Sequence, residues 1–296
     1  MTKSQEQAKV HKLYDLIGER SNRNGPDWTV SVTYGDQAEI HAGMSKEGAL
    51  RERGLTVKEL QDIAAIYHSK GAKVEYYDLN TIGLQNPQIC EPAAILIVRG
   101  GVDVMLKPFG VNAWHMYHEQ RSLPPCTKFY NARAKKVQNK NARWNNVFGF
   151  ADDPGDLTQG RGPVTHFDRV PITGALQAMW PDFVGDSAKE LVRALFAESN
   201  IYYEQNSYIG YHGDKERRIV ICARLGRSMK LAYTFFQNCN AISQPIILEL
   251  HHGDIYFMSS KAVGFDWRQT KDSLVTLRHA AAFETKKLYP VIKQKK

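Results

Sequence analysis

Residues 219–236 read IVICARLGRSMKLAYTFF and contain two runs rich in apolar residues, 219–225 and 230–236, which we expect to be β-strands. Three further short runs of this kind follow at residues 246–250, 255–258 and 274–277. Short strands at hairpin-like spacing are typical of a β-sandwich or jelly roll. The part of the chain after Tyr202 therefore predicts a jelly-roll architecture.

The first 110 residues alternate between helical and strand patterns. Thr56 and Glu59 form a capping-box sequence at the start of an expected helix over residues 56–69. The other expected elements are an amphipathic helix over residues 3–20, strands over 28–34, 73–79 and 93–98, and later a helical segment over 171–198 that includes 188–196. We predict an α+β protein, with a small α/β unit in residues 1–110 and a jelly-roll domain in residues 111–296.

Composition and charge narrow the class of protein. The 39 Lys and Arg residues exceed the 31 Asp and Glu residues, and the net charge of +8 favours a polyanionic partner. The four cysteines are far apart and form no CxxC pair, which argues against a zinc knuckle and a disulfide framework. The N-terminus lacks the apolar core of a signal peptide, and no apolar stretch approaches the roughly 20 residues that span a bilayer. We expect an intracellular protein, cytoplasmic or nuclear, without a membrane partner.

Basic and aromatic residues are interleaved in the segment from Phe129 to Phe150. Cations can contact phosphates while aromatic rings stack on bases, so this pattern suits contact with nucleic acid. The alternative is a solvated basic surface whose rings point into the core. The candidate nucleic-acid-binding residues are Arg133, Lys135, Lys136, Lys140 and Arg143.

The segment Tyr211-His212-Gly213-Asp214 carries the strongest chemical signal. His212 and Asp214 are two residues apart just before an expected strand, so their side chains project to the same side of an extended backbone. An imidazole and a carboxylate held in this way are two of the three ligands in a 2-His-1-carboxylate iron site. We therefore predict that His212 and Asp214 are catalytic metal ligands.

The surrounding motifs strengthen this prediction. The order Asn206-x-Tyr208, HxDxE from His212 to Glu216, an HGD block at 252–254 and Thr276-Leu277-Arg278 resembles the AlkB family of Fe(II)/2-oxoglutarate dioxygenases over roughly residues 129–283. The resemblance implies a double-stranded β-helix, a variant of the jelly roll. It also implies that Asn206 and Tyr208 hydrogen-bond 2-oxoglutarate and that Arg278 binds one of its carboxylates.

The sequence departs from this family at the third metal ligand, because residues 253–277 contain no histidine. In one interpretation His279 is the ligand, Arg278 points to the opposite face of its strand, and Lys230 or Lys261 binds the 2-oxoglutarate carboxylate. In the other, Arg278 keeps its role and Asp266 or water completes the site. A neutral imidazole holds Fe(II) better than water does, which favours His279.

The function implied by the resemblance is hydroxylation, and in some cases demethylation, of an alkylated base in DNA or RNA, with Fe(II) and 2-oxoglutarate as cofactors. A 2-oxoglutarate-dependent hydroxylase of a protein or small molecule is the alternative within enzymes. A nucleic-acid-binding module with a degenerate metal site is the alternative from another class, and it is motivated by the departure at the third ligand.

Overall fold

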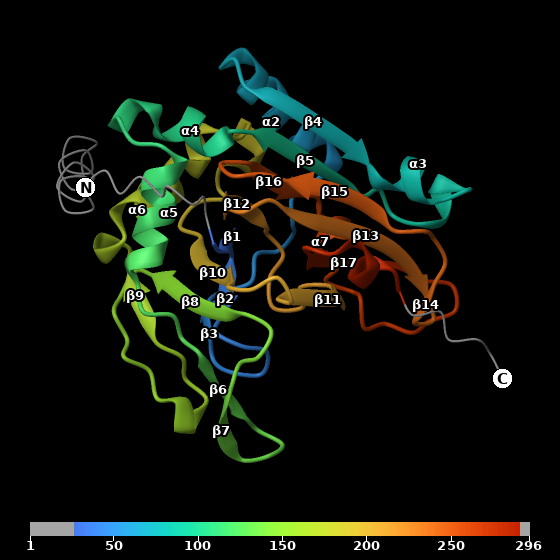
Figure 1. The fold of residues 1–296 in the computed structure, drawn as a ribbon. Helices are drawn as coiled ribbons and strands as arrows, with labels where there is room; N and C mark the ends of the chain where they lie inside the picture. Colours follow the sequence, from blue (N-terminus) through green and yellow to red (C-terminus); the bar gives the residue numbers. More distant parts are fainter. Residues whose placement is uncertain (1–26, 291–296) are drawn as a thin grey trace.

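The computed structural model describes residues 27–290, which form a mixed α/β fold built mostly of strands (Figure 1). The helix expected over residues 3–20 lies outside the described residues. The larger sheet has eight strands in the order β4-β5-β16-β12-β1-β10-β8-β9, with β8 and β9 parallel and the other neighbours antiparallel. Its strands are β1 Thr29–Gly35, β4 Lys73–Asp78, β5 Ala94–Arg99, β8 Trp144–Gly149, β9 Val164–His166, β10 Phe196–Tyr202, β12 Ile221–Gly226 and β16 Ile255–Met258.

A second, curled antiparallel sheet lies against the first and is orange to red in Figure 1. In it β13 is the central strand and pairs with β17, β15 and β14, while β11 pairs with the outer edge of β17. The bounds are β11 Tyr208–His212, β13 Met229–Gln237, β14 Asn240–Ala241, β15 Ile246–Leu250 and β17 Val275–Ala282. Two small hairpins complete the strands, β2 Gln37–Glu39 with β3 Lys46–Gly48 and β6 Lys128–Asn131 with β7 Lys136–Asn139.

Strand β5 of the larger sheet is buried on both faces. In β5, Leu96 and Val98 pack in the core shared with the helices, whereas Ile95 and Ile97 pack in the core shared with the second sheet. Burial on both faces explains why β5 is a continuous apolar run, AILIVR, without alternation. The helices are α2 Val57–Ser69, α3 Leu79–Gly83, α4 Gly101–Leu106, α5 Ala113–Ser122, α6 Pro171–Met179 and α7 Ser260–Val263.

Most of the expected elements are confirmed. Helix α2 begins after Thr56, and Thr56 and Glu59 form the reciprocal capping box. The helix expected over residues 188–196 is wrong, because residues 189–194 are turns and β10 begins at Phe196. Ala194 has a φ of 53°, which breaks any helix at this point. Only Phe196 of the AKELVRALF stretch belongs to β10, where it pairs with Gly35 of β1.

The expected boundary near residue 110 does not divide the larger sheet. Strands β1, β4 and β5 precede it, yet β1 lies between β10 and β12, and β5 pairs with β16. Strands from both sides of residue 110 therefore share one hydrogen-bonded sheet and both of the largest cores.

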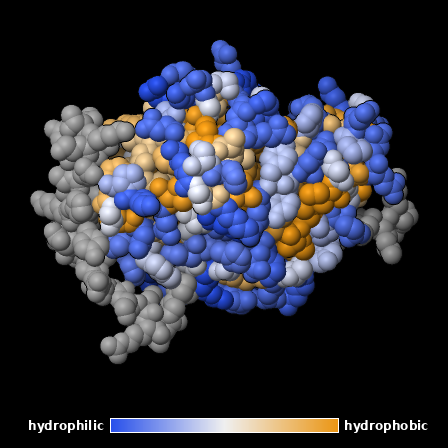
Figure 2. Space-filling model, turned by 90° about the horizontal axis from the view of Figure 1, so that it is seen from above, coloured by the Kyte–Doolittle hydropathy of each residue, from blue (hydrophilic) through white to orange (hydrophobic). Residues whose placement is uncertain are grey.

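Polar side chains cover much of the face shown in Figure 2, with smaller apolar patches between them. Within residues 27–290, none of the helices combines the length and the apolar character needed to cross a bilayer.

Candidate metal centre and its cavity

His212, Asp214 and His279 come together at the β11 edge of the second sheet. One ligand atom from each of the three side chains lies within 4.8 Å of those of the others. The Asp214 carboxylate is 3.6 Å from Nε2 of His212 and 3.7 Å from Nε2 of His279. These distances leave room for an ion between the three donors, and two imidazoles with one carboxylate suit a divalent transition metal.

The backbone places these donors by two means. His212 pairs directly with His279 across β11 and β17, after a register shift between Ile209 and His212. Asp214 lies beyond the end of β11, and its amide donates to the Val263 carbonyl over 2.9 Å. The expectation that the HxD segment precedes a strand is therefore corrected, because His212 is the last residue of β11.

Gly213 allows the chain to turn between the two ligands. A Cβ at this position would lie 2.1 Å from the carbonyl oxygen of Gly264, so any larger residue meets backbone. Gly264 itself has a φ of 75°, a conformation that favours glycine. The close approach of these two glycines carries Asp214 toward the histidines.

The surroundings keep both imidazoles suitable as ligands. His279 is 6% exposed, and burial followed by the neighbouring His212 lowers its pKa well below the usual value. Nδ1 of His212 lies 2.9 Å from the Gly210 carbonyl oxygen, to which a protonated Nδ1 donates. That hydrogen bond leaves the Nε2 lone pair directed at the cluster.

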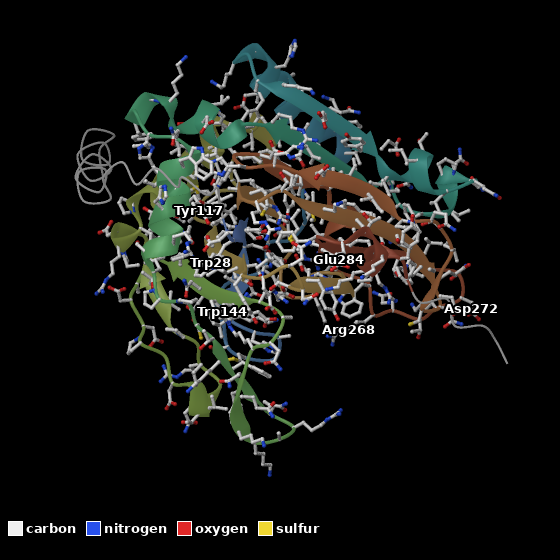
Figure 3. The ribbon with its side chains drawn as sticks, viewed as in Figure 1. Trp28, Tyr117, Trp144, Arg268, Asp272 and Glu284 are labelled. Atoms are coloured by element: carbon white, nitrogen blue, oxygen red, sulfur yellow. The ribbon has the colours of Figure 1, made fainter. Side chains whose placement is uncertain are left out.

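The cluster opens into a cavity of about 500 Å³ between the two sheets. The second sheet contributes Ile209, Leu231 and Ala281 beside the cluster, and Arg268, labelled in Figure 3, lies on the loop after α7. The facing wall belongs to the larger sheet and is polar. It includes Ser31, Thr33, Glu198, Asn200, Tyr202, Arg224 and Tyr256.

A buried ion pair lies in the polar wall of the cavity. Arg217 donates to Glu198 over 2.6 Å and to Glu216 over 3.2 Å, and the side chains of Arg217 and Glu198 are 5% and 6% exposed. Glu39 lies nearby, and burial together with Glu216 and Glu198 raises its pKa to about 7. The cavity lining therefore includes, on β2, a carboxyl group whose pKa lies well above its usual value.

The residues expected to bind 2-oxoglutarate do not line this cavity. Arg278 faces away from His279 and packs over the rings of Phe236 and Trp267. Lys230 donates to the Phe283 carbonyl, and Lys261 forms an ion pair of 2.7 Å with Asp266. That ion pair also occupies Asp266, the alternative third ligand.

Asn206 and Tyr208 lie at the outer edge of the second sheet. Tyr208 is 43% exposed, and Lys287 contacts both residues. The structure thus brings together the three expected metal ligands but separates all five expected cosubstrate residues from them.

The basic segment forms the β6–β7 hairpin, which extends away from the sheets at the bottom of Figure 1. Arg133, Lys135 and Lys136 are exposed on it. Beside the hairpin lies a groove of about 670 Å³ whose lining includes Lys136, Arg143 and the stacked rings of His41 and Phe129. Arg143 and His41 also line the cavity of the metal cluster, so the groove and the cavity adjoin.

Lys140 is a correction to the predicted nucleic-acid surface. It is 7% exposed, and its ammonium donates to the Ile40 carbonyl over 2.8 Å and to Asn145 over 3.1 Å. Its cation therefore holds the hairpin to the β2 region instead of facing solvent. Some rings of the segment also point inward, since Phe148 is fully buried and Trp144 stacks on Tyr203 with ring centroids 4.0 Å apart.

Sequence reasoning missed Arg224 and Glu198. Arg224 did carry a signal, because it is a charged residue within the otherwise apolar strand ICARLG. Such a residue, when buried, requires a partner or a ligand. Glu198 carried none, since its pairing with Arg217 depends on how the loop before β12 packs against β10.

No protein-family model matches the chain. It is 35% identical over 256 residues to the "Uncharacterized protein R156" of Acanthamoeba polyphaga mimivirus. The match covers 85% of this chain and 94% of the mimivirus protein, so it includes nearly the whole of that relative.

Proposed function

The chain belongs to the same family as mimivirus protein R156, and we propose that it is an Fe(II)/2-oxoglutarate-dependent dioxygenase. The observation that carries this proposal is the His212–Asp214–His279 cluster at the edge of a cavity between two sheets. Two imidazoles and one carboxylate leave several positions of a bound Fe(II) open, and such an ion would supply the activation of O₂.

The reaction would convert 2-oxoglutarate and O₂ into succinate and CO₂ while one oxygen atom hydroxylates a C–H bond of the substrate. Within it, His212, Asp214 and His279 would hold the ion, and the apolar side chains Leu231 and Met258 on the cavity wall would limit the access of water. Tyr233, which is fully buried and pairs with His279 across β13 and β17, packs beside this ligand with ring centroids 6.0 Å apart.

We also infer that the two sheets are the halves of a double-stranded β-helix. In this arrangement β16 and β12 face β17, β13 and β15 across a common apolar core, while β1 and β10 face β11 across the cavity. Strand β1 then belongs to the catalytic fold although it lies near the start of the described chain. This inference accounts for the position of β1 between β10 and β12.

The proposed substrate is an alkylated base in DNA or RNA. The groove beside the β6–β7 hairpin supports this, because it adjoins the cavity and combines Lys136 and Arg143 with the ring of Phe129. Such enzymes take the target base out of the stack, and a stacking ring at the entrance suits that step. Arg133 and Lys135 extend the positive surface along the hairpin.

A hydroxylase of a protein or small molecule is the second candidate. The hydrogen bonds that Lys140 and Arg143 make within the protein favour this candidate. Lys140 donates to Asn145 and Arg143 donates to Asn200, so these two cations have fewer donors available for phosphates. The third alternative, a binding module with a degenerate metal site, loses its motivation because His279 stands where a third ligand is needed.

The test is succinate formation by the Fe(II)-loaded protein with 2-oxoglutarate and alkylated single-stranded DNA or RNA, alongside unmodified oligonucleotides. We expect succinate to rise with the alkylated oligonucleotide and not in an Asp214→Ala variant. Log affinity falls linearly with log salt concentration. Replacing Arg133, Lys135 and Lys136 by Gln should make this dependence shallower, reducing the magnitude of the negative slope by roughly 2. Succinate formation without any binding of oligonucleotides at low salt would contradict the nucleobase substrate. The absence of succinate under every condition would contradict the oxygenase.

A further inference from the structure

Arg224 is a buried cation without an anionic partner. It lies on β12 and is 1% exposed. Within residues 27–290, its guanidinium has one hydrogen bond, from Nη1 to the sulfur of Met229 over 3.6 Å. Its Nε has no hydrogen-bond partner, and no carboxylate oxygen of residues 27–290 lies within 4.0 Å of its guanidinium. A guanidinium does not lose its proton in proteins, and a buried unpaired charge is strongly destabilising. The position therefore fits a charge that is neutralised by a ligand.

Arg224 lines the same cavity as the metal cluster. On the neighbouring strand β1, Ser31 is its direct partner in register, so both side chains project from the same face of the sheet. The Ser31 hydroxyl is also buried without a partner. Two unsatisfied polar groups thus lie side by side on the wall that faces the second sheet and His279.

The other buried or half-buried arginines of this cavity differ from Arg224. Arg217 is paired with Glu198 and Glu216, and Arg143 donates to Asn200. Two carboxylates neutralise the charge of Arg217, although its Nε has no hydrogen-bond partner, and half-buried Arg143 has an internal amide acceptor. Arg224 differs from both because it is fully buried and has neither a carboxylate nor an oxygen acceptor among the contacts of residues 27–290.

We propose that Arg224 and the Ser31 hydroxyl bind a carboxylate of an anionic ligand whose other end reaches the His212–Asp214–His279 cluster. The guanidinium fork matches a carboxylate in bidentate geometry. This assignment rests on the proposed oxygenase, in which the ligand is 2-oxoglutarate. In this assignment, Arg224 on β12 binds the 2-oxoglutarate carboxylate that is remote from the metal. Arg278, Lys230 and Lys261 do not, because they lie outside the cavity.

The experiment is calorimetric titration of the Mn(II)-loaded protein with 2-oxoglutarate and with pyruvate, which keeps the 2-oxo acid but lacks the second carboxylate. Arg224→Met should weaken 2-oxoglutarate binding by at least about 30-fold and leave pyruvate binding within about twofold of wild type. Arg278→Met is the matched control and should change neither. Ser31→Ala should weaken 2-oxoglutarate by roughly fivefold, as expected for one neutral hydrogen bond.

Thermal melting shows that the variant is folded and tests the unpaired charge. Without ligand, Arg224→Met should melt about 3 °C or more above wild type, because an apolar side chain replaces a buried cation. Equal 2-oxoglutarate affinity in wild type and Arg224→Met, or a lower melting temperature of the free variant, would overturn the assignment.

Glutarate separates this assignment from the proposed function. If glutarate binds the metal-free protein through Arg224 while Mn(II) and Fe(II) fail to bind, the anion site is supported and the oxygenase is contradicted. If the metals and 2-oxoglutarate bind without any effect of Arg224→Met, the anion site is overturned and the oxygenase remains.

Discussion

His212 and His279 face each other directly across β11 and β17, with ring centroids 4.4 Å apart. The two residues are separated by more than sixty positions in the chain, and only the pairing of these strands brings them together. Strand pairing thus supplies the third donor that the motif order lacked, and it leaves Arg278 on the opposite face.

We predict that His279→Ala lowers the affinity for Fe(II) or Mn(II) by more than about 100-fold, because one of three protein donors is removed. Calorimetric titration under nitrogen measures the effect. His251→Ala is the control, since His251 lies next to Ser228 and outside the cluster. Equal metal affinities in His279→Ala and wild type would show that His279 is not a ligand.

Gly213→Ala should destabilise the protein by roughly 1–3 kcal/mol and weaken metal binding, because the new methyl group meets the Gly264 carbonyl. Gly210→Ala is a matched control three residues earlier in the chain, where a Cβ meets nothing within 4 Å. Denaturant unfolding and metal titration of both variants test this prediction. Similar behaviour of the two variants would mean that the glycine contact does not position Asp214.

Arg217→Met should destabilise the protein by about 3–5 kcal/mol, because it leaves the buried Glu198 carboxylate without its cation. The double variant Arg217→Met/Glu198→Gln should recover part of this loss. Arg193→Met breaks an exposed ion pair with Glu190, and solvent screening should make its effect on the unfolding free energy much smaller than that of Arg217→Met. Equal unfolding free energies for Arg217→Met and Arg193→Met would contradict the importance of the buried pair.

Lys140→Met should change how stability depends on alkaline pH. Burial lowers the pKa of Lys140 from 10.5 to about 8, so between these values the unfolded chain binds more protons than the folded protein. The contribution of Lys140 to stability then rises with pH from about 8 to 10.5 and is constant below that window. Relative to Lys140→Met, wild type should gain on the order of 3 kcal/mol across it.

Urea unfolding of both proteins at pH 7, 8, 9 and 10 measures this difference. A difference that is constant over the whole range would mean that the Lys140 ammonium is as well solvated as in the unfolded chain. Lys136→Met provides the control, since Lys136 is exposed on the same hairpin.

Local patterns predicted the elements that carry strong local signals. The capping box of Thr56 and Glu59 and the apolar runs of β5, β12 and β13 each determine their own structure. Residues 188–196 show the limit, because their helical propensity does not produce the expected helix: residues 189–194 form turns, and Ala194 has a φ of 53°. Propensity describes a segment alone, whereas strand order depends on the whole chain.

Some residues of the candidate site could likewise be predicted from the sequence, whereas others depend on contacts within the fold. His212 and Asp214 are neighbours in sequence, and the chemical preference of Fe(II) for imidazole selected His279. Lys140, by contrast, has the same local sequence character as the exposed Lys136, and only the contact with Ile40 makes it a buried residue. Arg224 shows its role only when β12 is seen to face the cavity.

The most direct test of the account is an anaerobic titration of the protein with Fe(II) followed by 2-oxoglutarate, monitored by visible absorption. We predict a metal-to-ligand charge-transfer band that saturates at one Fe(II) per chain in wild type and is absent in the His279→Ala variant. Absence of the band in wild type, or an unchanged band in His279→Ala, would contradict the assignment of His212, Asp214 and His279 as the iron site of an oxygenase.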